Sequence, residues 1–237
     1  MMDEFCDIIN KLSSKIAKQK NDCKTEEATK TAFILPFFNA LGYDTSDPSV
    51  FVPEMPCDIS GKYEAVDYCV HKNRKPIIVV ECKHWQQKLD NHIGQMKRYF
   101  YACEDAHFAC LTNGIEYRFY TDLNKPNIMD DEPFLVVNME KLDDMTLPRL
   151  EWFKNDCFDD VLLLQNAKEQ TMRNRTEAVL HSEFTSPSDS FIAFISKKVL
   201  GGRTGSKQER SILFNIVKEI GQGLINSVKL PPPIRTL

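Results

Sequence analysis

The sequence predicts an α/β protein in which a mixed β-sheet is flanked by helices and followed by a helical C-terminal part. Apolar residues recur with helical spacing before residue 42 and again after residue 143, whereas short β-type runs fill most of the region between. A single helical pattern interrupts those runs, as expected for a helix that crosses a sheet. We therefore expect a first domain at 1–142 and a helical C-terminal region at 143–237.

Two helices are expected before the sheet. The first should cover residues 3–20, where the apolar residues recur with helical spacing. The second should begin after Thr25, a favourable N-cap that two acidic residues follow, and should end near Gly42. Pro36 lies inside this second pattern and predicts either a kink or an early end of its first turn.

The strands are expected from β-type runs that polar turns separate. VFVPE begins at Val50, YEAVDYCV and KPIIVVECK follow, and the polar HKNRK between the last two predicts a hairpin. The helical run LDNHIGQMKRYFYAC comes next. Two further strands follow it, joined by Asn113-Gly114, a pair typical of tight hairpin turns. PFLVVNM is the last strand candidate.

The remaining chain is expected to be helical. A long helix should lie around 143–180, a second at 187–200 and a third at about 206–228. Pro187 precedes the second helix, and the glycine-rich LGGRTG separates it from the third.

Composition is that of an ordinary globular protein, with 42% hydrophobic residues and a net charge of −4. This net charge argues against a protein that binds nucleic acid through its overall charge. The basic residues between 71 and 98 form either a local surface that binds phosphates or an ordinary solvated surface. Eight cysteines without a C-x-x-C pair are typical of free thiols. Because the chain has no long apolar run and no signal-peptide pattern, we expect a cytoplasmic protein without a membrane span.

Two ionisable residues stand at the end of an apolar strand, in the run IIVVECKHW. Burying a charge is costly unless it is paired or binds a metal, so Glu81 and Lys83 need an explanation. Both should point to the same side of the strand, and the hairpin would bring Asp67 beside them. Two carboxylates, waters and a substrate phosphate suit Mg²⁺. The alternative explanation is a salt-bridged sheet edge.

The spacing of Asp67 and Glu81-Cys82-Lys83 resembles the PD-(D/E)xK nuclease core. The flanking runs extend this resemblance, over roughly residues 20–140, to the family of type I restriction enzyme R-subunit N-terminal domains. They are TEEATKTAFILPFFNALGYD, VPE, VDY, PIIVVECK, QMKRYF, LTNGIEYRFYTDL and MDDEPFLVV. The resemblance implies a restriction-endonuclease-like fold and Mg²⁺-dependent hydrolysis of DNA phosphodiester bonds in bacterial defence, with Mn²⁺ as a substitute.

The same resemblance assigns roles to the motif residues. Asp67 and Glu81 would bind the metal, with the backbone carbonyl of Cys82 as an additional ligand. Lys83 would assist the nucleophile.

Further roles fall on the two helices beside the motif. Gln95 would orient the site or touch the DNA backbone together with Tyr99. Glu26 would be an auxiliary acid at the metal, although Glu27 could serve equally, and the helix macrodipole alone explains an acid there. The expected phosphate contacts are Lys97 and Arg98.

The expected partners are DNA, a second copy of the chain, and a motor or specificity subunit on another chain. ATP-driven translocation is not expected from this sequence, because GGRTGSK at 201–207 lacks the G-x-x-x-x-G-K-[ST] spacing. Two alternatives remain open: a catalytically silent module that binds nucleic acid or a partner on the same fold, and a nuclease that acts on RNA.

Overall fold

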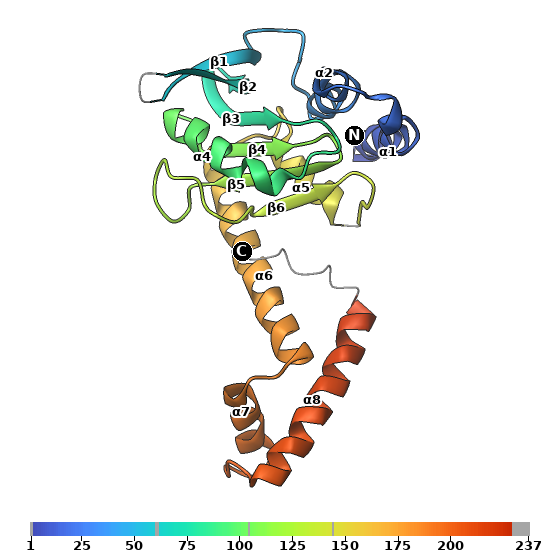
Figure 1. The fold of residues 1–237 in the computed structure, drawn as a ribbon, viewed down its shortest axis with the longest axis vertical. Helices are drawn as coiled ribbons and strands as arrows, with labels where there is room; N and C mark the ends of the chain where they lie inside the picture. The colour runs from blue at the N-terminus through green and yellow to red at the C-terminus, as the bar shows by residue number, and fades with distance from the viewer. Residues whose placement is uncertain (1, 60–61, 104, 144, 229–237) are drawn as a thin grey trace. The chain divides into compact units, whose positions relative to one another are not determined.

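The computed structural model describes residues 2–59, 62–103, 105–143 and 145–228 (Figure 1). Contacts divide the chain into two compact units, Met1–Glu169 and Gln170–Leu237, so the division falls inside the long helix α6. The first unit contains the whole sheet. The domain boundary that we expect between residues 142 and 143 stays a prediction.

The N-terminal helices are those that the sequence predicts, with one irregular turn. The helix α1 covers Met2–Gln19, a 3₁₀ turn η1 follows at Lys20–Asp22, and α2 covers Glu26–Thr29. Thr25 caps α2, because its hydroxyl accepts from the backbone N–H of Ala28 at 3.1 Å.

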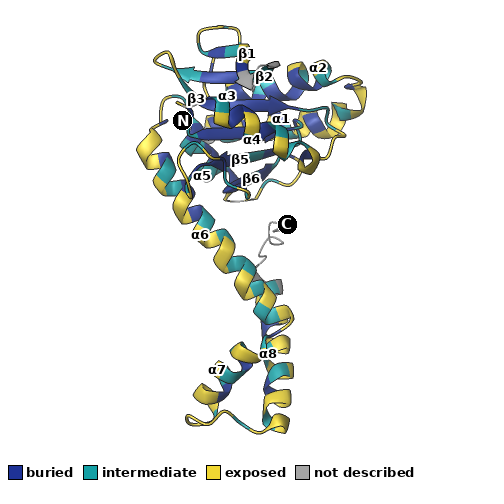
Figure 2. Cartoon of the chain, turned by 60° about the vertical axis from the view of Figure 1, so that its left-hand side comes forward, coloured by how far each residue is buried: buried dark blue, intermediate teal, exposed yellow. Residues whose placement is uncertain are grey.

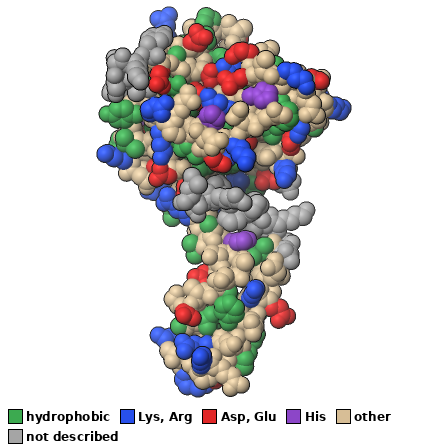
Figure 3. Space-filling model, in the orientation of Figure 1, with side chains coloured by type: hydrophobic (Ala, Val, Ile, Leu, Met, Phe, Trp, Pro, Cys, Tyr) green, Lys and Arg blue, Asp and Glu red, His purple; other side chains and the backbone are tan. Residues whose placement is uncertain are grey.

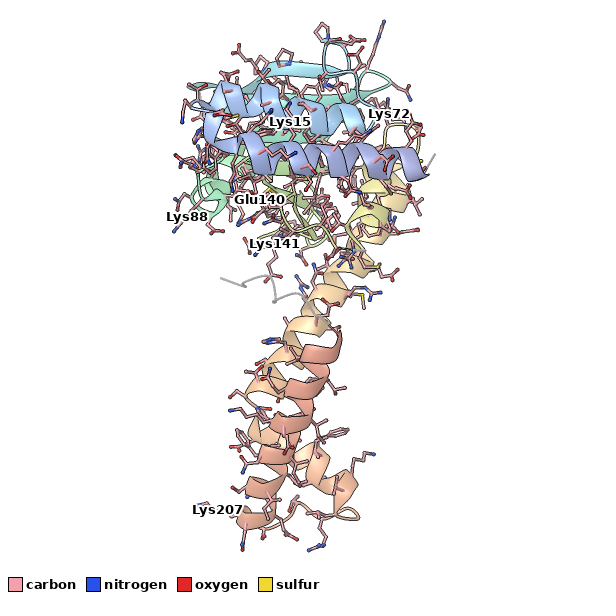
Figure 4. The ribbon with its side chains drawn as sticks, turned by 90° about the vertical axis from the view of Figure 1, so that its right-hand side faces the viewer. Lys15, Lys72, Lys88, Glu140, Lys141 and Lys207 are labelled. Carbon is pink, nitrogen blue, oxygen red and sulfur yellow. The ribbon has the colours of Figure 1, made fainter. Side chains whose placement is uncertain are left out.

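Pro36 neither ends this helix nor breaks it. A π-helical turn, η2 at Lys30–Ile34, precedes it, and α3 continues through Leu35–Ala40. Proline has no N–H for the carbonyl four residues earlier, so the carbonyl of Ala32 lacks its usual partner. Lys15 of α1, labelled in Figure 4, donates to that carbonyl at 2.9 Å. Lys30 is the first residue of this π-helical turn.

The sheet has six strands in the order of the chain, β1-β2-β3-β4-β5-β6 (Figure 1). Every neighbouring pair is antiparallel except β3 and β4, which are parallel. Two positive-φ residues, Asn73 and Arg74, form the turn between β2 and β3, and Gly114 at φ 78° lies in the turn after β4. The strands are β1 at Phe51–Ile59, β2 at Lys62–Lys72, β3 at Lys75–Cys82, β4 at Phe108–Thr112, β5 at Glu116–Thr121 and β6 at Leu135–Asn138.

A crossover of two helical segments joins the parallel strands: η3 at Leu89–His92 and α4 at Ile93–Ala102. Buried apolar residues form two clusters, one with α1 to α3 and one with α4. Val80 belongs to the first cluster and Val79 to the second, so β3 is buried on both faces (Figure 2). This explains why its sequence is continuously apolar rather than alternating.

The prediction of a single long helix around 143–180 is wrong. The structure has α5 at Thr146–Leu150, a 3₁₀ turn η4 at Glu151–Phe153 and, after a non-helical stretch, α6 at Asp160–Thr185. Backbone carbonyls between these helices accept from side chains of the sheet unit instead of from a continuing helix. The donors are Tyr43 Oη to Phe153 O at 2.9 Å, and Lys72 Nζ, labelled in Figure 4, to Asn155 O at 2.6 Å and to Phe158 O at 2.8 Å.

The other two C-terminal helices agree with the sequence. They are α7 at Asp189–Val199 and α8 at Lys207–Val228. Ser188 caps α7 by accepting from the N–H of Phe191 at 3.1 Å. Within the described residues, no helix combines the length and the apolar character that crossing a membrane requires.

Candidate active site

The ends of β2 and β3 bring Asp67 and Glu81 together, as the hairpin predicts. The paired residues of the two strands run as far as Tyr68 opposite Val80, so Asp67 and Glu81 are next in register. Beyond this point the ladder is continued by a side chain, because Asp67 Oδ2 accepts from the backbone N–H of Cys82 at 2.7 Å. Asp67 is therefore fixed to the end of β3.

Glu81 is a buried carboxylate with only one of its oxygens bonded. Its exposed fraction is 2%, Oε1 accepts from Lys83 Nζ at 2.5 Å, and Oε2 is buried without a hydrogen-bond partner in the described structure. Burial, and then the charge of Asp67, raise the pKa of Glu81 to about 7, although the Lys83 ammonium opposes the shift. Lys83 itself is largely buried. Burial alone would lower the pKa of Lys83, but the bond to Glu81 and its charge raise it.

Lys30 joins this site from the helical side. Its Nζ lies 2.6 Å from Asp67 Oδ1 and 2.8 Å from Glu27 Oε1, and its side chain is 9% exposed. Burial would lower the pKa of Lys30, but its bonds to Asp67 and Glu27 raise it above the usual range. The acid of β2 thus has a lysine counter-ion from a residue 37 positions away.

The two acids of α2 lie differently. Glu26 is 3.6 Å from Lys30 Nζ, its side chain is 39% exposed, and its charge contributes to the raised pKa of Lys83. The side chain of Glu27 is 76% exposed and bonds to Lys30. Glu26 is therefore the acid that acts electrostatically on the strand-end lysine.

Gln95 and Tyr99 form a pair on α4, with Gln95 Nε2 donating to Tyr99 Oη at 2.8 Å. The tyrosine is 4% exposed and belongs to the apolar cluster beneath α4, so its ring is a core side chain. Burial raises the pKa of Tyr99, and the charge of Glu81 adds to this. The pair thus lies within electrostatic reach of the strand-end acid.

The two expected phosphate contacts are already paired with acids. Lys97 forms an ion pair with Asp131, and Arg98 Nη2 lies 3.6 Å from Glu64 Oε2. Basic and acidic side chains are interspersed on the face of the sheet unit that Figure 3 shows. The structure brings neither cation into the group formed by Asp67, Glu81 and Lys83.

Two residues near the site were not assigned roles from the sequence, Lys30 and His92. His92 precedes α4, and its Nε2 is buried with no partner in the described structure. Burial, and then the charge of Lys83, lower the pKa of His92. A lysine three and four positions after two acids is visible in the sequence, but nothing local indicates that it reaches Asp67.

The two carboxylates of this site, Asp67 and Glu81, could supply only part of the ligands of a magnesium ion. In the part of the chain that the structure describes, no group of three or more His, Cys, Asp or Glu side chains is arranged to hold a metal. Mg²⁺ needs no such group, because it commonly takes one or two carboxylates and keeps several waters. The unpartnered Glu81 Oε2 beside Asp67 is the acceptor that a cation would satisfy.

Comparison with known proteins gives one match. Residues 25–133 match the family model of the type I restriction enzyme R protein N terminus. No curated protein and no solved structure matches the chain. The matched segment starts at the cap of α2 and contains the strand-end acids, Lys83 and the Gln95–Tyr99 pair. As the sequence motifs predicted, the segment 25–133 is similar to the N terminus of type I restriction enzyme R proteins.

Proposed function

We propose that this protein is a metal-dependent endonuclease that hydrolyses DNA phosphodiester bonds in a restriction system. The observation that carries the proposal is the buried Glu81, whose free oxygen lies at the end of β3 with Asp67 and Lys83 beside it. The similarity of residues 25–133 to the N terminus of a restriction-enzyme subunit supports the role in restriction and DNA as the partner.

In this mechanism Asp67 and Glu81, with the backbone carbonyl of Cys82, would hold the metal, and Glu26 would act as the auxiliary acid. A bound Mg²⁺ supplies a polarised phosphoryl oxygen and a water of lowered pKa. Lys83, held by Glu81 at 2.5 Å, orients the attacking water and stabilises the negative charge that develops on the phosphate.

The Gln95–Tyr99 pair positions this group from the helical side. Gln95 donates one amide hydrogen to Tyr99, which leaves its second amide hydrogen to donate to a phosphate of the DNA backbone. Phosphates farther along the DNA would approach Lys97 and Arg98 and would displace their acidic partners.

The test is cleavage of supercoiled plasmid and of single-stranded DNA with Mg²⁺, with Mn²⁺ and with EDTA. The variant is Glu81→Gln, and the control is Glu116→Gln, which changes a half-buried acid of the same sheet. We expect metal-dependent cutting that Glu81→Gln abolishes and Glu116→Gln retains. Equal DNA binding by all three proteins without any cutting would instead favour the binding module, for which the ion pair of Lys30 and Asp67 would be structural.

A homodimer is the second part of this proposal. Among the described residues of the C-terminal unit, the only large apolar side chains that are buried are Ile192 and Leu213. Meanwhile Ile212, Ile216 and Ile220 on α8 are 53%, 42% and 59% exposed, and their spacing of four residues places them on one face of the helix. A second copy would cover this face, and two copies of one active site suit the cutting of two strands.

Sedimentation tests the dimer. We expect the wild-type chain to sediment as a dimer and Ile216→Glu as a monomer that nicks DNA but no longer cuts both strands. Monomeric wild-type protein that cuts both strands would contradict it.

A further inference from the structure

Lys30 forms ion pairs with three carboxylates. Its ammonium lies 2.6 Å from Asp67 Oδ1, 2.8 Å from Glu27 Oε1 and 3.6 Å from Glu26 Oε1. The side chain is 9% exposed, and it also lies over the ring of Tyr68, 5.9 Å from the centroid. One ammonium thus serves three carboxylates from two elements of the fold.

This arrangement occupies the acid that the proposed metal needs. Asp67 Oδ2 is bonded to the N–H of Cys82, and Oδ1 is bonded to Lys30. A divalent cation held by Asp67 would lie near the ammonium, which is 2.6 Å from Oδ1. The positive charges of the metal and of the Lys30 ammonium would repel each other strongly, because little water is present to screen them in this buried site. The ammonium and the metal therefore compete for Asp67.

The structure also provides a second place for the ammonium. Glu26 and Glu27 are four and three residues before Lys30 on the same helical segment, and both are more exposed than Asp67. A lysine has a flexible four-carbon stem and three donors, so it can leave Asp67 and keep its bond to Glu27. The backbone at this point is the start of the π-helical turn, a feature that is frequent at functional sites.

We propose that Lys30 is an exchangeable counter-ion, which neutralises Asp67 in the metal-free protein and shifts to Glu27 when a divalent cation binds. The proposal rests on the metal site of the proposed function. In this proposal Lys30 has two roles. Without metal, its charge reduces the repulsion between the carboxylates of Asp67 and Glu81. When metal binds, the free energy needed to displace its ammonium from Asp67 lowers the metal affinity. The exchange also gives Glu27 a role that requires no contact with the metal.

Calorimetric titration with Mn²⁺ in the absence of DNA tests this exchange. Lys30→Gln should bind Mn²⁺ about tenfold more tightly than wild type, because the competing charge is gone. Lys30→Arg, which keeps the charge, should stay near wild type. Lys15→Gln removes a lysine that bonds to the same helical segment at Ala32 O, and it should leave the affinity unchanged.

A double-mutant cycle with Glu27 separates the exchange from general electrostatics. Glu27→Gln should weaken Mn²⁺ binding several-fold, because the displaced ammonium loses its main partner. This loss should disappear in the Lys30→Gln background, whereas simple attraction between Glu27 and the metal would persist there.

Each outcome decides a different point. Unchanged or weaker Mn²⁺ binding by a folded Lys30→Gln protein overturns the exchange. If that variant does not fold, unchanged binding by Glu27→Gln, altered at a side chain that is 76% exposed, overturns it instead. If neither wild type nor Glu81→Gln binds Mn²⁺, the proposed function fails as well. Binding by wild type that Glu81→Gln abolishes keeps the metal site, whatever Lys30 does.

Discussion

Replacing Glu81 by glutamine should stabilise the metal-free protein at neutral and alkaline pH, although the proposed catalysis needs this residue. The carboxylate is 2% exposed, it lies beside a second carboxylate, and its Oε2 has no partner in the described structure. A buried charge in this position lowers the free energy of unfolding, and Lys83 and the backbone of Asp67 offset it only in part.

The magnitude follows from the pKa of Glu81, which is about 7 in the folded protein against 4.5 for an ordinary glutamate. Between these two values the folded state holds a proton that the unfolded state has released. The free energy of unfolding therefore falls as the pH rises through this window, and the fall is complete above about pH 7. At about 1.4 kcal/mol for each pH unit, it amounts to about 3 kcal/mol.

Glutamine keeps the shape and an acceptor for Lys83 but does not titrate. Its bond to the ammonium is weaker than that of a carboxylate, which reduces the gain. We expect Glu81→Gln to be more stable than wild type by about 1–3 kcal/mol at pH 8, and to lose this advantage near pH 5.

The assay is urea unfolding of both proteins in EDTA at pH 5, 6, 7 and 8, with Glu116→Gln as the control. Adding saturating Mg²⁺ at pH 8 should raise the free energy of unfolding of the wild type but not that of Glu81→Gln, because a ligand stabilises only the state that binds it. Parallel pH profiles for wild type and Glu81→Gln would refute the reasoning.

Three other substitutions test the packing around the site and the C-terminal helices. Lys72→Met removes two bonds to backbone carbonyls before α6 and should lower the free energy of unfolding by about 2–3 kcal/mol in urea, without changing Mn²⁺ binding. Gly114→Ala strains a residue at φ 78° and places a Cβ 3.0 Å from Thr29, so it should lower the melting temperature by a similar free energy. Gly221→Ala places a Cβ 2.5 Å from that of Phe184, so limited proteolysis should cut the C-terminal helices faster.

Two other glycines provide matched controls for these changes. A Cβ at Gly94 on α4 or at Gly223 on α8 would meet no other atom within 4 Å. Alanine at either position should leave the melting temperature and the proteolysis rate unchanged or slightly improved, because alanine favours a helix. If Gly114→Ala and Gly221→Ala behave like these controls, the close packing described for them is wrong.

The features that the sequence predicted well depend on neighbouring residues. Thr25 caps its helix through a bond to an N–H three residues later, and Asn113-Gly114 makes a turn through its own backbone preferences. The continuous apolar run before Glu81 indicates a strand buried on both faces, whatever packs against it. Such signals can be read without knowledge of the rest of the fold.

The features that the sequence did not predict depend on distant partners. The broken helix after residue 143 results from Tyr43 and Lys72, which bond to carbonyls more than 80 positions later. The pairing of Lys30 with Asp67 likewise joins two elements that only the folded sheet brings together. The sequence shows a helical pattern after residue 143 and two acids before Lys30, but neither feature specifies a contact with a residue so far along the chain.

The same distant contacts bear on the choice between a nuclease and a binding module. Asp67, Glu81, Lys30 and Lys83 form a compact charged group at the end of β3, where it follows the buried apolar residues 77–80. An apolar group of similar volume is commonly as stable as buried ion pairs, so stability alone does not require this arrangement. The free oxygen of Glu81 adds to this argument, because most buried acceptors in proteins have a hydrogen-bond partner. A site that must receive a cation and then release it has reason to keep both the paired lysines and the unpaired oxygen.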